Sequence, residues 1–184
     1  MTSTRGVRTA AAAAVVAGLA TAASAGPLFI FEQSAGSFTV AFEDANTRNI
    51  LFETAVTFEV GGLGIVSIDG DYIQTFSGGS SDPISGTAVF EGASNLDTLT
   101  VSFDGVVYDN GFGSFSGSWE LTGSTGAYAQ YTSGEGNNSG SYFFTTDDSG
   151  NMYTIFQGTL VPTPGVLAIG GLGAGMLATR RRRA

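Results

Sequence analysis

Hydrophobic and polar residues alternate with a period of two along the middle of the chain, from about residue 26 onward. Phe38, Val40 and Phe42 alternate with small or polar residues, and a longer alternating series runs from Ile50 to Val60. A period of two is typical of a strand that buries one face and exposes the other, and no sustained helical period of 3.6 residues occurs here. The middle of the chain is therefore predicted to form β-sheet.

Turn-forming residues divide this region into short segments. Because turn signals recur every 8–12 residues or so, we predict roughly nine or ten short strands. The sequence Asp69-Gly70-Asp71 is predicted to be the turn of a hairpin, since glycine accepts a positive φ. Residues 78–83 and 134–140 are predicted to be longer loops. This spacing is typical of an all-β antiparallel barrel or, as the alternative, a β-sandwich.

The segment from Trp119 to Ala129 favours the barrel. Gly123 and Gly126 permit a tight corner, and Gly134 and Gly136 permit a bulge or a close approach of strands where a sheet curls. The segment resembles a strand–turn–strand pattern of allene oxide cyclase-like and dirigent-like eight-stranded barrels, and this resemblance implies a barrel. Trp119 shares its parity with neighbouring apolar residues and is expected to lie in the core.

The first 25 residues have the features of a signal peptide. Arg5 and Arg8 precede an apolar run, and Ala23-Ser24-Ala25 matches the small-x-small cleavage pattern. We therefore expect an N-terminal signal helix, cleavage by signal peptidase between Ala25 and Gly26, and export of the mature chain.

The C-terminus carries a second apolar segment with basic flanking residues. Val161-Pro162-Thr163-Pro164-Gly165 is followed by a 13-residue apolar run, 166–178, and then by Arg180, Arg181, Arg182 and Arg183. The run is shorter than the roughly 20 residues that a spanning helix needs. We expect an apolar helix that is held in the membrane transiently, with the arginines on the cytoplasmic side.

A Pro-x-Pro motif, an apolar span and a terminal arginine cluster behind a signal peptide resemble the PEP-CTERM sorting domain, although Thr163 stands where that family has glutamate. The resemblance implies processing by an exosortase, a membrane transpeptidase-like enzyme, in Gram-negative-type bacteria that make exopolysaccharide. A plain C-terminal membrane tail is the alternative. The predicted organisation is a signal peptide (1–25), an all-β domain (26–160) and a sorting signal (161–184).

The amino-acid composition excludes several classes of catalytic and metal site. The chain contains no histidine, cysteine or lysine, which excludes Ser-His-Asp triads, thiolate metal sites and Schiff-base lysines. All sixteen carboxylates lie between Glu32 and Asp148, where Arg48 is the only basic residue, so residues 26–161 carry a net charge of −15. A surface of this kind repels phosphate, which excludes nucleic acid as a partner. We expect a protein that is not an enzyme.

Acidic residues near glycine turns suggest weak Ca²⁺ ligation. The candidates are Asp69 with Asp71, Asp104 with Asp109, and above all Asp147 and Asp148 with Asn151. Oxygen ligands suit Ca²⁺, but the spacing is not that of a helical calcium-binding loop, and Asp and Asn are also common turn residues. No two carboxylates stand out as the catalytic pair that glycoside hydrolysis requires. We expect no cofactor apart from weakly bound Ca²⁺.

Together these features predict an exported bacterial protein of the cell surface or extracellular space. Its expected role is that of a non-enzymatic β-domain associated with the cell envelope or an exopolysaccharide matrix. The alternative is a β-barrel that binds a small apolar ligand or a glycan.

Overall fold

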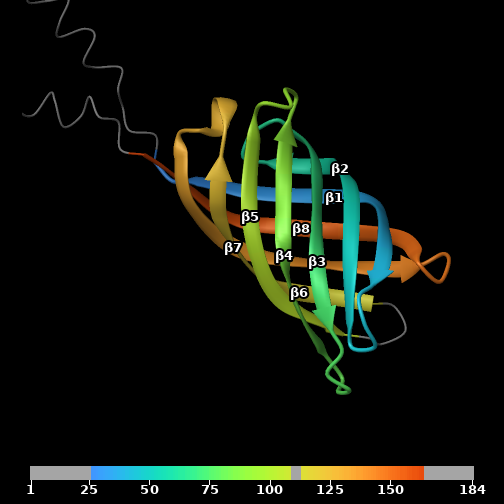
Figure 1. Ribbon diagram of the computed structural model, residues 1–184. Helices are drawn as coiled ribbons and strands as arrows, with labels where there is room; N and C mark the ends of the chain where they lie inside the picture. Colours follow the sequence, from blue (N-terminus) through green and yellow to red (C-terminus); the bar gives the residue numbers. More distant parts are fainter. Residues whose placement is uncertain (1–25, 109–112, 164–184) are drawn as a thin grey trace, which may run out of the picture. The chain divides into compact units, whose positions relative to one another are not determined.

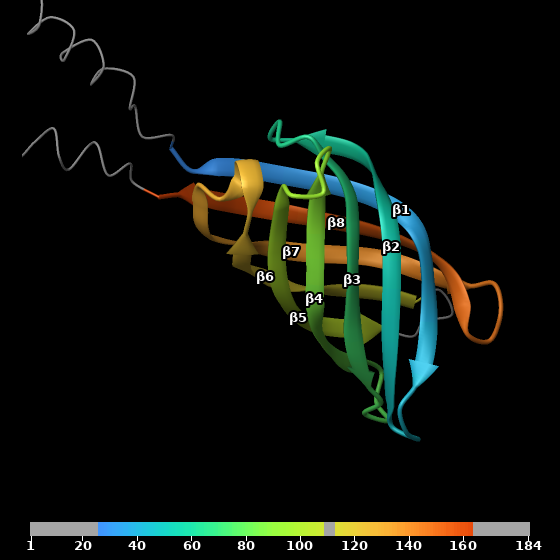
Figure 2. The same ribbon diagram turned by 45° about the horizontal axis from the view of Figure 1, so that its top comes forward.

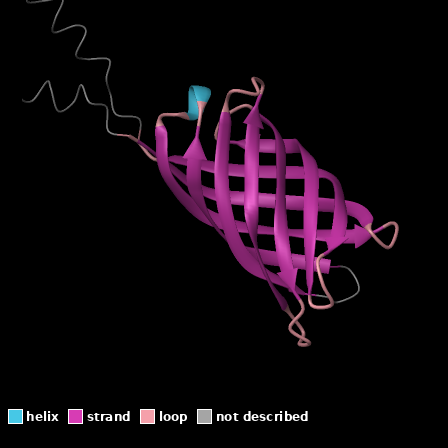
Figure 3. Ribbon diagram, in the orientation of Figure 1, coloured by secondary structure: helices cyan, strands magenta, loops and turns pink. Residues whose placement is uncertain are grey.

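The computed structural model describes residues 26–108 and 113–163 (Figure 1). Eight strands and one three-residue 3₁₀ helix account for most of them (Figure 3). In chain order the elements are β1 (Leu28–Phe42), β2 (Thr47–Val60), β3 (Ile65–Thr75), β4 (Asp82–Gly92), β5 (Thr98–Tyr108), β6 (Gly113–Ser124), η1 (Gly126–Tyr128), β7 (Tyr131–Phe144) and β8 (Ser149–Pro162).

The eight strands form a closed antiparallel barrel in which each strand pairs with the next one in sequence (Figure 2). The barrel closes where β8 returns to β1, with Leu28 opposite Leu160 and Thr39 opposite Ser149. The predicted all-β antiparallel barrel is thus confirmed, and the sandwich is not the fold. The predicted signal helix (1–25) and C-terminal apolar helix (166–178) lie outside the described residues.

Two predictions about glycine were wrong. Asp69-Gly70-Asp71 is not a turn but the middle of β3, and residues 134–140 are not a loop but part of β7. Gly70 faces the interior, where an added Cβ would lie 2.7 Å from the Phe52 ring. These glycines make space for large side chains instead of turning the chain, so the barrel has eight long strands and not nine or ten short ones.

The interior is filled by side chains from alternate strand positions. Trp119 is 1 % exposed, as predicted for a core residue, and its indole lies over Gly136 and Gly158 while its Nε1 donates to the Gln157 carbonyl at 3.1 Å. Phe90 and Phe156 meet edge to face at 5.0 Å between ring centroids. A void lined by Phe52, Phe156 and neighbouring residues measures only about 10 Å³, no more than one water molecule requires.

The two ends of the barrel carry different loops. The entry end is where β1 begins and β8 ends, and it carries the loops 61–64, 93–97 and 125–130. The far end carries the loops 43–46, 76–81 and 145–148. In residues 26–108 and 113–163 no helix has the length and apolar character that a membrane crossing requires.

Candidate functional site

A buried carboxyl group and a half-buried one face each other at the entry end. Glu32 on β1 is 0 % exposed and stands directly opposite Glu59 on β2. Neither carboxylate oxygen of Glu32 has a hydrogen-bond partner within the described part of the chain. Burial raises the pKa of Glu32 from 4.5 to about 8, and the charge of Glu59 contributes in the same direction. Glu32 is therefore a neutral carboxylic acid at pH 7.

The β2–β3 loop folds over this pair. The Glu59 Oε1 accepts a hydrogen bond from the Gly64 amide at 2.8 Å, and the Tyr128 hydroxyl of η1 donates to the Leu63 carbonyl at 2.8 Å. Gly61, Gly62 and Gly64 all have positive φ, a conformation that glycine adopts without strain. The loop is thus tied to β2 on one side and to η1 on the other, which closes the barrel above Glu32.

Further negative charge surrounds Tyr128. Burial raises the pKa of its hydroxyl, and Asp97, Glu59 and Glu32 add to the rise in that order. Even so, no three acidic side chains in the described residues form a group that could hold a metal ion. The entry end can therefore hold a proton on Glu32, but it does not have the donor set of a cation site.

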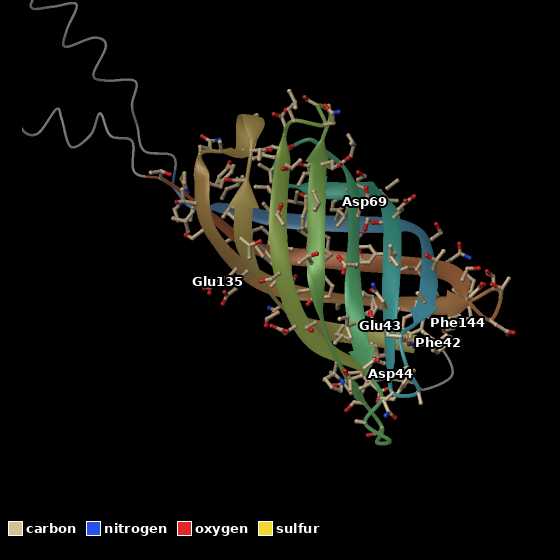
Figure 4. The ribbon with its side chains drawn as sticks, in the orientation of Figure 1. Phe42, Glu43, Asp44, Asp69, Glu135 and Phe144 are labelled. Carbon is tan, nitrogen blue, oxygen red and sulfur yellow. The ribbon has the colours of Figure 1, made fainter. Side chains whose placement is uncertain are left out.

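Arg48, the single basic residue of the predicted β-domain, closes the far end. Its Nε and Nη2 donate to the Gln74 Oε1 at 3.0 and 2.8 Å, and Nη2 also donates to the Tyr142 hydroxyl at 3.3 Å. The guanidinium lies 5.2 Å from the ring centroid of Phe76 and 5.4 Å from that of Phe144. Arg48 is thus a structural residue and not a free site for an anionic partner. Figure 4 labels Phe144 at this end, together with Phe42, Glu43 and Asp44.

Replacing Arg48 by methionine should lower the free energy of unfolding by about 2 kcal/mol, because Gln74 is 1 % exposed and its Oε1 would lose both donors. Urea denaturation followed by circular dichroism measures the change. Arg48→Lys should recover only part of the loss, because lysine keeps the positive charge near the Phe76 and Phe144 rings but cannot donate two hydrogen bonds to Gln74 in the geometry of a guanidinium. Wild-type stability in Arg48→Met would contradict this role.

The remaining acids lie mainly on the outside of the barrel. Glu120 on β6 and Glu135 on β7 stand directly opposite each other, and Figure 4 shows Glu135 pointing away from the barrel. A surface hollow of about 570 Å³ lies beside this pair and is also lined by Ser133, Thr159 and Val161. Like charges at opposing positions repel, so such a hollow favours cations over anions.

The predicted calcium ligands are spread over a turn and a strand. Asp147 and Asp148 are exposed in the turn between β7 and β8, and the Asp148 carboxylate accepts a hydrogen bond from the Thr146 hydroxyl at 2.8 Å. Asn151 lies beyond the turn on β8, opposite Ser37 of β1 and Phe143 of β7. The structure therefore assigns Asp148 a local bond within the turn and places Asn151 on the outer surface of the sheet.

The first two residues of the predicted sorting motif belong to strand β8. Val161 is exposed and Pro162 is buried at the end of β8, where Pro162 stands opposite Tyr131. Thr163 and Gly26 are the exposed ends of the described chain. The other predicted signal residues, Ala23, Ala25, Pro164, Gly165 and Arg180 to Arg183, lie outside the described residues, as does Asp109.

The sequence analysis does not predict the Glu32–Glu59 pair, although the alternation along β1 carries a signal for Glu32. Glu32 has the same parity along β1 as Phe38 and Val40. The β-bulge between β1 and β2 places its extra residue, Thr57, on β2, so it does not interrupt the alternation of β1. The parity of β1 therefore runs unbroken from Ile30 to Val40 and places Glu32 inside. Comparison with known proteins adds no assignment to these sites: no family model matches the chain, and no curated protein matches it in sequence.

Proposed function

We propose that this protein is an exported, non-enzymatic β-barrel that serves at the bacterial cell surface or in the extracellular polysaccharide matrix. In this proposal signal peptidase removes residues 1–25, and an exosortase-like enzyme recognises the tail 161–184 while its apolar run is briefly in the membrane. No cofactor is required, and Ca²⁺ acts only as a weakly held counter-ion of the acidic surface, including Asp147 and Asp148.

The pairing of Leu28 with Leu160 is the observation that supports this proposal most directly. Because β1 and β8 are antiparallel neighbours, the first residue of β1 and the last residues of β8 lie at the same end of the barrel. A barrel attached in this way can be held by one end while its sides and far end stay accessible. The arrangement suits a domain that is displayed from a tail and later released from it.

The distribution of charge gives further support. Each of the six strands β2 to β7 carries a carboxylate that faces outward, while Arg48 is occupied at the far end. Repulsion between such surfaces keeps a protein soluble at high concentration. Within the barrel the void of about 10 Å³ leaves no room for a small apolar ligand, so the proposal does not include an interior ligand.

Intact-mass analysis of the protein from cell-envelope and medium fractions tests the proposal. We expect a chain that starts at Gly26 and lacks the apolar run and the four arginines. Replacing Arg180 to Arg183 by glutamine should leave the tail in place and hold the protein in the membrane fraction, because the positive residues orient the span. A released wild-type protein that still carries residues 166–184 would contradict sorting by cleavage.

A further inference from the structure

The outer surface of the barrel has one face without charge. Apart from Glu32, which points inward, β1 and β8 contain no charged residue at all. The outward positions of the other six strands each include at least one carboxylate, namely Glu53, Asp69, Asp71, Glu91, Asp104, Glu120 and Glu135. An uncharged partner can therefore bind to the β8–β1 face without removing water from a charged side chain, which would cost free energy.

A hollow of about 370 Å³ opens on this face, between β7, β8 and β1. The strand register explains it. Tyr153 stands opposite Ala35 on one side and Ser141 on the other, and Asn151 stands opposite Phe143. Ala35 and Gly36 have little or no side chain, so the surface over β1 is recessed relative to the larger side chain of Tyr153 on β8.

The side chains around this hollow combine exposed aromatic rings with neutral polar groups. Phe143 is 51 % exposed and Tyr153 is 36 % exposed, and they occupy diagonal positions of the β7–β8 ladder, close enough for both rings to touch one ligand. Ser141 and Asn151 occupy the other diagonal and offer a hydroxyl and an amide. The amide can donate and accept hydrogen bonds at the same time.

We propose that this hollow binds one neutral sugar unit of a polysaccharide chain. A pyranose has an apolar face of C–H groups that packs on aromatic rings, and a rim of hydroxyls that pairs with amides and hydroxyls. The volume lies within the range of ordinary ligand sites. The hollow beside Glu120 and Glu135 lacks the aromatic rings and carries two carboxylates, so it does not suit the same ligand. The inference rests on the proposed matrix location and names the partner there.

Native affinity electrophoresis of the full chain tests the inference. The protein is run in gels that contain hydroxyethyl cellulose, dextran or galactomannan, and in a gel that contains the anionic polysaccharide alginate. We expect retardation by at least one of the neutral polymers and none by alginate. Tyr153→Ala should weaken the binding about tenfold, because it removes one of the two rings. Ala35→Leu should do the same by filling the floor of the hollow while leaving both rings in place.

Phe58→Ala is the control, since Phe58 is also an exposed aromatic residue, 52 % exposed against 36 % for Tyr153, and lies on β2 outside the hollow. It should keep wild-type retardation, and circular dichroism should show the same β-spectrum for all variants. Three results would overturn the inference: no retardation of the wild type by any neutral polymer, wild-type retardation of both Tyr153→Ala and Ala35→Leu, or equal loss in Phe58→Ala. None of them bears on tail cleavage, which the mass measurement tests separately.

Discussion

Glu32→Gln should abolish most of the pH dependence of the barrel's stability between about pH 5 and pH 9. In the wild type the pKa of Glu32 is about 8 in the folded state, against an ordinary value of 4.5. Between these values the folded protein holds a proton that the unfolded chain has lost, so the free energy of unfolding falls as the pH rises. The fall begins near pH 4.5 and is complete just above pH 8.

The effect is large because Glu32 is fully buried. A shift from 4.5 to about 8 corresponds to at most about 5 kcal/mol, which is a substantial part of the stability of an ordinary domain. Glutamine has the shape of the protonated acid and does not ionise, so the variant should keep at pH 9 the stability that it has at pH 5. Above pH 8 it should be more stable than the wild type.

Thermal melts at half-unit pH intervals measure this difference. Glu43→Gln is the matched control, because it makes the same change at an exposed position in the loop 43–46, and the fall in stability with rising pH should persist in it. If the wild type melts at the same temperature at pH 5.5 and pH 8.5, Glu32 does not carry a proton in the folded state.

Gly158→Ala should strongly destabilise the barrel, because Gly158 lies directly beneath the Trp119 indole. A Cβ at this position would lie 2.5 Å from the Trp119 Cζ2 and even closer to the Glu135 carbonyl oxygen. The indole is 1 % exposed, and the hydrogen bond from its Nε1 to the Gln157 carbonyl holds it in place. We expect a loss of about 3 kcal/mol in the free energy of unfolding, as for an overpacked core.

Gly123→Ala provides the comparison, because its added Cβ would meet nothing closer than the Thr100 Cβ at 3.6 Å, and its φ is not positive. Alanine there should be neutral or slightly stabilising, since it restricts the unfolded chain. Denaturant titration of both variants separates the two cases. Equal stabilities would mean that the neighbours of Gly158 shift at little cost.

The same glycines explain which parts of the fold could be predicted from the sequence. Period-two alternation was enough to predict an all-β protein, and the parity of Trp119 with Phe115 was enough to predict that it lies in the core. Gly70 and Gly136 were interpreted through backbone freedom, whereas their actual use is to leave room for the side chains of Phe52 and Trp119. A single sequence does not distinguish these two uses of glycine, because the crowding side chain comes from another strand.

The candidate sites could not be predicted fully from the sequence either, because they depend on which residues the strand register places opposite each other. The parity of Glu32 could have placed it inside, but its position opposite Glu59 follows from the pairing of β1 with β2 and from the irregularity at Thr57. The hollow beside Tyr153 depends on Ala35, which lies 118 positions earlier in the chain and becomes its neighbour only because the barrel closes. Asp147 and Asp148 do lie in the turn between β7 and β8, because that signal is local, but the predicted turn 147–151 extends into β8, which begins at Ser149.

The closure of β8 onto β1 also has a consequence for the timing of folding. Every other strand pair joins elements that are neighbours in sequence, so those hairpins can form as soon as their residues are available. β1 and β8 must wait for each other across the whole length of the domain. Until then both keep an unpaired row of backbone amides and carbonyls, which is a template for association with other chains. During synthesis from the N-terminus, β1 is therefore the strand whose second edge stays unpaired for longest.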